Sequence, residues 1–159
     1  MKSQLSADRP TAQHLVGTDP PRFARVSRLV LHGLVAVTAI AGGAALILGA
    51  LNPELATVLS PPQAYLEGSP FSSYLVPGLL LAIVVGGTQA VAFLLGVTRS
   101  DLALLGSATA AMALLIWVFV QMMFIPFSFL QALYFAFGIA ETGLVLLALG
   151  ILRLPSRSR

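Results

Sequence analysis

Phe127–Ile151, with the sequence FSFLQALYFAFGIAETGLVLLALGI, is the stretch that decides how the rest of the chain folds. It is apolar almost throughout and longer than the roughly 20 residues that a helix needs to cross a bilayer. Gln131, Tyr134, Gly138 and Glu141 are spaced by three, four and three residues, so they share one face of a helix. The stretch therefore predicts a membrane-spanning helix with one polar face, which is where chemistry would lie.

The composition of the whole chain agrees with a membrane protein. Of its 159 residues, 57% are hydrophobic and only 9% are charged, whereas soluble domains average roughly 25% charged residues. The absence of cysteine excludes disulfides, thiolate metal sites and a lipoprotein anchor. The net charge of +3 does not indicate a nucleic-acid partner, because the basic residues flank apolar spans and no base-stacking aromatic pattern accompanies them.

Three further apolar stretches precede the decisive one, and together they predict an all-α, up-down bundle of four transmembrane helices. The spans are expected at about residues 29–51, 74–97, 102–125 and 127–151, within a transmembrane domain of residues 29–152. The remaining segments are expected to be a disordered basic tail (1–28), an extracytoplasmic loop (52–73) and a second basic tail (153–159).

Local signals refine this plan. Asn52-Pro53-Glu54 has the residue types of an N-cap, a first-position proline and an acidic first turn, which predicts a short helix to about Ser60. Pro77 is expected to kink the second span. Small residues at four-residue spacing predict two seams of close helix contact. These seams are Ala41, Ala45 and Gly49 in the first span and Ala82, Gly86 and Ala90 in the second.

The basic residues predict the orientation. With four spans, all nine Lys and Arg residues fall on the side that holds both termini and the turn at residues 98–101. Because cytoplasmic loops carry the excess of basic residues, we expect both termini in the cytoplasm and the chain in the bacterial cytoplasmic membrane as a multi-pass protein. The basic collar of Arg22, Arg25 and Arg28 is interpreted as part of this topology signal.

Polar residues inside the spans form two predicted layers when depth is counted from the span ends. Thr38, Gln89, Thr109 and Glu141 lie nearer the cytoplasmic half. Gln121, Gln131 and Tyr134 lie nearer the outer half, with Trp117 just below them. Unpaired polar groups are costly in hydrocarbon, so we expect these side chains to face the interior and to contact one another.

Glu141 is the residue with the strongest claim to a function. A charged carboxylate at mid-bilayer costs roughly 2.5–3.5 kcal/mol on insertion scales, so the neutral form is cheaper and could donate a hydrogen bond to Gln89 or to a backbone carbonyl. Three interpretations are open: a tie between spans four and two, a proton or cation relay, and a contact to a polar ligand. His32 is interpreted as a partner of head groups or backbone at the interface rather than as a ligand.

Each residue of the outer polar layer has both a structural and a ligand-binding interpretation. Gln121 and Gln131 are interpreted either as interhelical hydrogen-bonding residues or as ligand contacts. Trp117 and Tyr134 are interpreted as belt or packing residues, or as residues that stack on a ligand. No HExxH, GxSxG or His pair on one helix is present. No catalytic residue, metal site or cofactor is therefore predicted.

Several segments resemble a group of small bacterial membrane proteins with four spans. The group carries an S-P-F-x-x-Y-L-x-P-G segment at the entry to its second helix, which corresponds here to Ser69–Gly78. Trp117–Gln121 is similar to the W-x-x-x-Q pattern of its third helix, and Leu130–Tyr134 with Gly138 is similar to the start of its fourth. The resemblance covers most of residues 29–152, implies the four-span topology and carries over no catalytic residue. A looser resemblance to the DoxX-like four-helix proteins concerns architecture only.

The sequence therefore favours a non-enzymatic membrane protein that binds an apolar or amphipathic small molecule or lipid, or that stabilises a membrane protein assembly. Its partners would be the bilayer and either another membrane protein or a second copy of the chain. The alternative is a small proton- or cation-coupled transporter that uses Glu141 as a relay. A relay needs a wet path to Glu141, whereas a binding or assembly protein needs a dry, packed one.

The predicted topology can be tested by single-cysteine labelling, because the chain has no cysteine of its own. In vesicles of known orientation, Ser3→Cys and Ser156→Cys should react only with reagents on the cytoplasmic side, and Gln63→Cys only with reagents on the other side. Labelling of position 63 from the cytoplasm would contradict the four-span topology.

Overall fold

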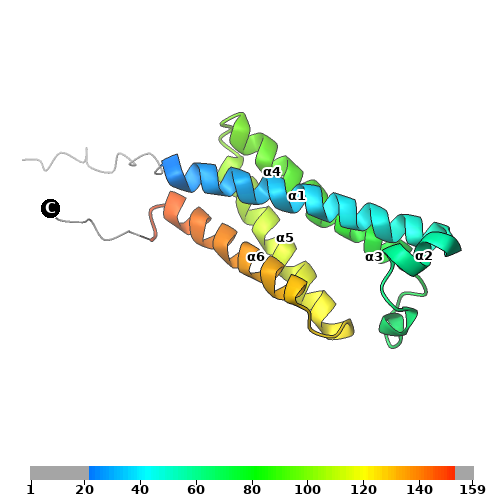
Figure 1. Cartoon of the computed structure of the whole chain (residues 1–159). Coiled ribbons are helices and arrows are strands. Elements are labelled where there is room, and N and C mark those ends of the chain that lie inside the picture. The colour runs from blue at the N-terminus through cyan, green and yellow to red at the C-terminus, as the bar shows by residue number, and fades with distance from the viewer. Residues whose placement is uncertain (1–21, 153–159) are drawn as a thin grey trace, which may run out of the picture.

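The computed structural model describes residues 22–152, and four of its helical stretches are long and apolar enough to cross a membrane (Figure 1). They are Arg22–Leu51, Leu75–Val97, Ala103–Phe124 and Phe129–Ala148. No strand occurs among the described residues. The predicted all-α fold with four membrane-spanning helices is confirmed.

The chain order follows the prediction closely. The first crossing is α1 (Arg22–Leu51), and the loop after it contains α2 (Pro53–Leu59) and the short helix η1 (Gln63–Leu66). The second crossing consists of α3 (Leu75–Leu80), the π-helical segment η2 (Leu81–Gly86) and α4 (Gly87–Val97). The third and fourth crossings are α5 (Ala103–Phe124) and α6 (Phe129–Ala148).

The helix α2 carries the predicted cap. The Asn52 side chain accepts a hydrogen bond of 2.9 Å from the backbone N–H of Glu54, and Pro53 opens α2. Pro77 lies in the first turn of α3, where its missing N–H leaves no helical hydrogen bond unmade. The second crossing also contains an irregular part that was not predicted, the π-helical segment η2, which begins four residues after Pro77.

The first helix is longer than predicted. Residues 22–28 were assigned to the tail, but α1 already begins at Arg22. The guanidinium of Arg25 donates a hydrogen bond of 3.0 Å to the carbonyl of Gly96 at the end of α4. It thus satisfies a helix-terminal carbonyl that has no partner within its own helix, which gives the basic collar a structural role. The rest of the first predicted tail (1–21) and the second (153–159) lie outside the described residues.

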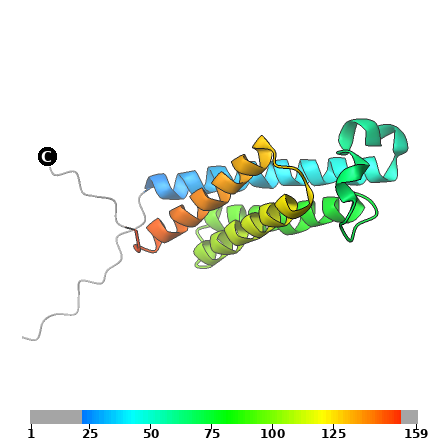
Figure 2. The ribbon, with the colours of Figure 1, turned by 90° about the horizontal axis from the view of Figure 1, so that it is seen from below.

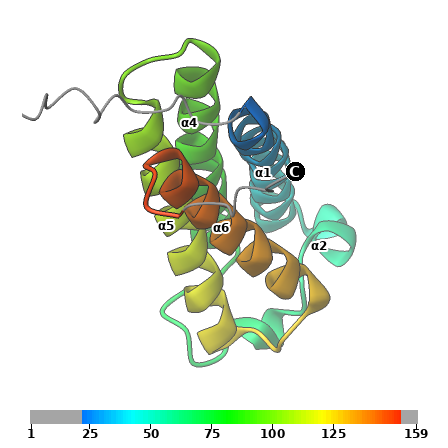
Figure 3. The ribbon, with the colours of Figure 1, turned by 90° about the vertical axis from the view of Figure 1, so that its left-hand side faces the viewer.

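The four crossings are arranged as two hairpins. We call α1 with α3–η2–α4 the first hairpin, and α5 with α6 the second. Figures 1 and 3 show that the hairpins lie close together where α1 begins and α6 ends, and diverge toward the end that carries α2. We call these two ends the basic end, where Arg22, Arg25 and Arg99 lie, and the loop end. Figure 2 shows that the first hairpin extends beyond the α5–α6 turn at the loop end.

Close backbone contact holds the first hairpin together. A Cβ added to Gly43 on α1 would lie 2.6 Å from the carbonyl oxygen of Gly78 and 2.7 Å from the Cβ of Ala82. Gly86, in the predicted seam of the second span, is also buried against α1. The predicted seam of the first span is confirmed in part: Gly49 is buried against Leu59 and Ser60 and Ala45 is half-buried, but Ala41 is exposed. The close contact with the second crossing is made by Gly43, which the prediction did not include.

We expect Gly43→Ala to destabilise the protein, by about 1–3 kcal/mol as for other overpacked sites, because its methyl group would collide with backbone. Gly42→Ala is the matched control on the same helix, where the new Cβ would meet only a Leu81 methyl group at 3.5 Å. Thermal unfolding of both variants in detergent measures the difference. Equal stability of the two variants would contradict the close contact at Gly43.

Candidate functional site

Three polar side chains from three different crossings meet in the interior of the bundle. They are His32 on α1, Gln89 on α4 and Glu141 on α6, and their exposed fractions are 1%, 0% and 0%. The Nδ1 of His32 lies 2.6 Å from the Oε1 of Gln89 and 3.2 Å from the Oε1 of Glu141. The Nε2 of Gln89 donates a hydrogen bond of 2.9 Å to the Oε2 of Glu141. We call these three residues the polar cluster.

Gln89 connects all four crossings. Besides Glu141, its Nε2 also faces the carbonyl oxygen of Ala110 on α5 at 3.4 Å. The amide nitrogen thus points at two acceptors, and the amide oxygen points at His32. The Nδ1 of His32 therefore carries a hydrogen, because it faces two oxygens, one of which belongs to an amide and only accepts.

Glu141 and Gln89 were predicted to contact one another, and they do. The direction of the bond differs from the prediction, because Gln89 donates and the carboxyl group accepts. The second carboxyl oxygen, Oε1, lies 3.2 Å from the Nδ1 of His32, but it has no hydrogen-bond partner among the described residues. Within that part of the chain, Glu141 is therefore hydrogen-bonded to Gln89 alone.

His32 was expected to contact head groups or backbone at the interface, and the structure corrects this. Its side chain is buried, and its Nδ1 lies against the side chains of Gln89 and Glu141. His32 shares its buried face with Val35, Ala36 and Ala39. This spacing of three, four and seven residues is the sequence signal that could have placed His32 in the interior.

Two other members of the predicted inner layer do not join the cluster. Thr38 and Thr109 are both exposed, and Thr38 lines the cavity of about 230 Å³ between the diverging hairpins. The hydroxyl of Thr38 donates to the carbonyl of Leu34 at 2.8 Å, one turn earlier on its own helix. A threonine hydroxyl can thus be satisfied without a second helix, whereas the larger polar groups of Gln89 and Glu141 cannot.

Arg28 lies one turn before His32 on α1 and is also buried, with 7% of its surface exposed. Its Nε and Nη1 have no hydrogen-bond partner among the described residues, and neither does the Nε2 of His32. Residues four apart on a helix are neighbours. The cluster is therefore flanked, toward the basic end, by a buried positive charge.

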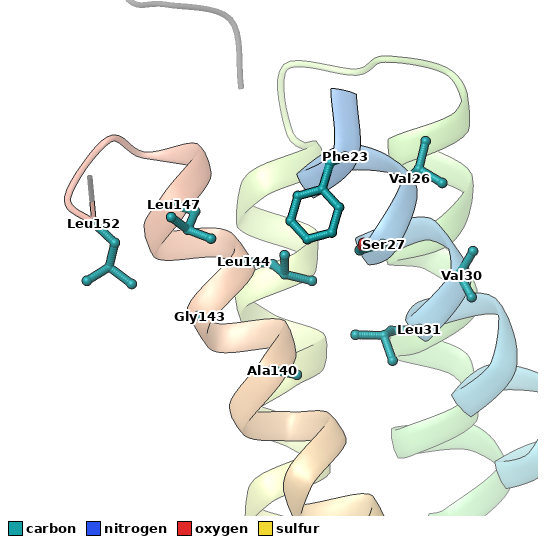
Figure 4. Close-up of a pocket in the computed structure, with 10 residues that line it drawn as sticks. All are labelled: Phe23, Val26, Ser27, Val30, Leu31, Ala140, Gly143, Leu144, Leu147 and Leu152. Carbon is teal, nitrogen blue, oxygen red and sulfur yellow. The ribbon is translucent and has the colours of Figure 1, made fainter. Parts of the chain in front are cut away.

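A groove runs between α1 and α6, the helices that carry His32 and Glu141. Figure 4 shows this groove at the basic end, where Leu31, Ala140 and Leu144 line it. The groove has a volume of about 580 Å³, and Ser27 is the one polar side chain among the residues that line it. It offers water almost no hydrogen-bonding partner, so it provides no wet path to Glu141.

One turn from the cluster toward the loop end, every crossing presents apolar side chains. Val35, Val85 and Leu114 form the centre of the buried core, with exposed fractions of 0–1%. Phe137 packs against them from α6. This apolar layer closes the cluster off from the wider space between the diverging hairpins.

Beyond the apolar layer lies a cavity of about 230 Å³, which we call the outer cavity. All four crossings contribute to its lining, which includes Ala39, Gly42, Val85, Leu114, Trp117, Gln121, Gln131 and Tyr134. A neighbouring cavity of about 120 Å³ reaches under the loop and shares Pro61, Trp117, Gln121 and Ile125 with the outer cavity. The predicted outer polar layer is thus brought together around one space.

The outer polar residues differ in how their hydrogen bonds are used. The Oε1 of Gln131 accepts a bond of 2.8 Å from the backbone N–H of Ser128, and the Oγ of Ser128 accepts one of 3.3 Å from the N–H of Gln131, which together cap α6. The ring of Tyr134 packs edge-on against the ring of Phe137, with 6.1 Å between the ring centroids. Within the described residues, the side chains of Gln121, Trp117 and Tyr134 make no hydrogen bond. Their polar groups remain available to a ligand.

No protein-family model, curated protein or solved structure matches the chain.

We expect Glu141→Ala to lower stability by about 1–2 kcal/mol, because it removes the carboxyl oxygen that accepts a hydrogen bond from the buried Nε2 of Gln89. Glu141→Gln should cost less, about one interhelical bond of roughly 0.6 kcal/mol. It keeps the shape but turns one acceptor into a donor that faces His32 or Gln89. Glu54→Gln, an exposed acid on α2, is the control. Thermal unfolding in detergent ranks the three variants, and an Ala variant as stable as the parent would contradict the role of the cluster as a tie.

Proposed function

We propose that this protein binds a small amphipathic molecule in the outer cavity, within a multi-pass helical bundle of the bacterial cytoplasmic membrane. The observation that carries the proposal is the composition of that cavity: an apolar floor of Val85 and Leu114 faces the side chains of Trp117, Gln121 and Tyr134, whose polar groups make no hydrogen bond within the described residues. An apolar space with a few polar groups around it is the usual form of a small-molecule site.

The size of the cavity limits the ligand. About 230 Å³ is several times the roughly 30 Å³ that one water occupies in the liquid, but it is less than the about 300–1,000 Å³ of drug-sized sites. It suits one or two fused rings, or the terminal part of a lipid chain, with one or two hydrogen-bonding groups. The neighbouring cavity of about 120 Å³ extends this space toward the loop.

The orientation of the site follows from the distribution of charge. Arg22, Arg25 and Arg99 lie at the basic end, and the loop with Glu54 and Glu67 lies at the other. With the basic end in the cytoplasm, the outer cavity faces the extracytoplasmic half of the membrane. A ligand would enter from that half of the bilayer or from beneath the loop.

An open proton or cation relay is the less supported alternative. His32, Gln89 and Glu141 have exposed fractions of 1% or less, and neither the outer cavity nor the groove of Figure 4 is lined by them. A continuous relay needs water or polar groups on both sides of Glu141. The apolar layer of Val35, Val85 and Leu114 separates the cluster from the outer cavity, which favours the binding function.

Trp117 allows a direct test, because it is the single tryptophan of the chain and it lines both cavities. Para-bromophenol is a small ring with one hydroxyl group, and its bromine quenches indole fluorescence on contact. We expect saturable quenching of Trp117 in detergent, in which added probe has no further effect once the cavity is filled. Purely linear quenching, without saturation, would contradict a defined site.

Two variants with the same substitution make the test specific. Gly42→Leu places a side chain into the outer cavity, which Gly42 lines, and should weaken probe binding by about tenfold or more. Gly87→Leu is the control, because a Cβ at Gly87 meets no atom within 4 Å and this residue lines a groove on the outer surface of the bundle. Equal binding by the two variants would place the probe elsewhere.

A further inference from the structure

The groove of Figure 4 is a second feature of the bundle that could hold a ligand. It runs between α1 and α6 from the basic end toward the middle of the bundle, and it shares no lining residue with the outer cavity. Its lining extends from Phe23 to Leu31 on α1 and from Ala140 to Leu147 on α6. A Cβ added to Gly143, in the wall formed by α6, would meet no atom within 4 Å. The groove is thus open on the lateral surface of the bundle.

The dimensions of the groove fit one acyl chain. Eight residues separate Phe23 from Leu31, which corresponds to about 12 Å at roughly 1.5 Å of helix per residue. One leaflet contributes about 15 Å of hydrocarbon, half of the bilayer core. The volume of about 580 Å³ is close to twenty times the roughly 30 Å³ that one water occupies in the liquid, and a methylene group is similar in size to a water molecule. The groove can therefore take most of one lipid chain.

The charge at the basic end suits an anion rather than a second copy of the chain. Among the described residues, this end carries a single acid, Asp101, and four arginines lie at it or one turn inside: Arg22, Arg25, Arg28 and Arg99. A second copy inserted with the same topology would bring its own arginines to the same side of the membrane. The cytoplasmic leaflet instead contains anionic phospholipids, which attract basic segments of this kind.

Two of these arginines adjoin the groove. Arg22 precedes Phe23, and Arg28 follows Ser27; Phe23 and Ser27 both line the groove. Because successive residues of a helix are rotated by about 100°, the two arginines flank the helix face that forms this wall. Arg25 is instead held by a carbonyl at the end of α4. A negative charge at the basic end of the groove would thus lie between two guanidinium groups.

The guanidinium of Arg28 has no anionic partner in the described part of the chain. Its Nε and Nη1 are buried and make no hydrogen bond there, and the ion pair of His32 with Glu141 does not include it. A buried charge is costly unless it is paired. The stem of an arginine is long and flexible, so the guanidinium can turn toward a phosphate at the basic end of the groove.

We propose that the groove binds one anionic phospholipid of the cytoplasmic leaflet, with an acyl chain between α1 and α6 and the phosphate between Arg22 and Arg28. The apolar lining takes the chain, and the hydroxyl of Ser27, the one polar side chain of the lining, can donate to an ester or phosphate oxygen. Arginine suits this role because its planar group binds phosphate through two parallel hydrogen bonds. This lipid site is separate from the outer cavity and does not depend on the proposed function.

Native mass spectrometry of the full chain in detergent tests the apolar part of the site. Phosphatidylglycerol and phosphatidylcholine with the same acyl chains are added in equal amounts. We expect one phosphatidylglycerol to be retained per chain, in preference to phosphatidylcholine. Gly143→Leu fills the groove and should weaken this binding by about tenfold or more. Gly87→Leu is the matched control, because its Cβ also meets no atom within 4 Å and it lines a different groove. Equal retention of the lipid by both variants would overturn the proposal.

Arginine variants test the charged part of the site. Arg22→Gln should reduce the preference for phosphatidylglycerol by about fivefold, the usual effect of one basic residue near an anionic membrane surface, and Arg28→Gln should reduce it at least as much. Arg99→Gln removes the same charge from the turn between α4 and α5 and should have a smaller effect. Arg22 is exposed, so its variant decides the matter even where Arg28→Gln does not fold. An Arg99→Gln variant that loses as much preference as Arg22→Gln would show general attraction without a site and would contradict the proposal.

The same measurement separates the lipid from other occupants of the groove. An excess of inorganic phosphate should leave phosphatidylglycerol bound, because phosphate alone has no chain to bury. Displacement by phosphate would indicate a phosphate site without a lipid and would overturn the proposal. A dimer of the parent that is lost in Gly143→Leu would place a second copy in the groove, with the same consequence. Equal retention of phosphatidylglycerol and phosphatidylcholine by the parent would rule out the role of the arginines.

Discussion

The arrangement of the four crossings depends on the carboxamide of Gln89. In hydrocarbon a polar group without a partner is costly, so a buried glutamine has to find donors and acceptors on neighbouring helices. Gln89 uses its oxygen for His32 and its nitrogen for Glu141 and the Ala110 carbonyl. These bonds fix the rotation and depth of α1, α4, α5 and α6 against one another, although each contributes little free energy. They add to the close packing of small residues such as Gly43 and Gly78, which also holds helices together in lipid.

The depth fixed by Gln89 arranges the interior in three layers. The polar cluster lies toward the basic end, followed by the apolar layer around Val35 and Leu114 and then by the outer cavity. Because the crossings alternate in direction, each layer draws on residues whose numbers rise along α1 and α5 and fall along α4 and α6. Such convergence of distant residues is what turns a simple up-down bundle into a protein with a defined interior site.

The sequence predicted the spans and their order, because a membrane-spanning helix is recognised by the length and hydropathy of one continuous segment. It also paired Gln89 with Glu141, since both lie at a similar depth and neither is tolerated by lipid. It missed the burial of His32, because this depends on contacts with Gln89 and Glu141, which are far away in the sequence. It also left Gly43 out of the seam of α1, because small residues occur all around that helix and only the partner decides which are used.

The outer cavity follows from an unequal distribution of small residues. Within the first hairpin Gly43 and Gly78 let the backbones touch, and within the second a Cβ at Gly138 would lie 2.7 Å from a Leu115 methyl group, so each hairpin is tightly closed. Between the hairpins, the large rings of Trp117 and Tyr134 stand where no such glycine contact exists. The two hairpins are connected at the depth of the polar cluster and diverge toward the loop end. The space between them there is the outer cavity, which their own side chains do not fill. The cavity therefore lies where the hairpins diverge, and Gly42 on α1 adds no side chain that would fill it.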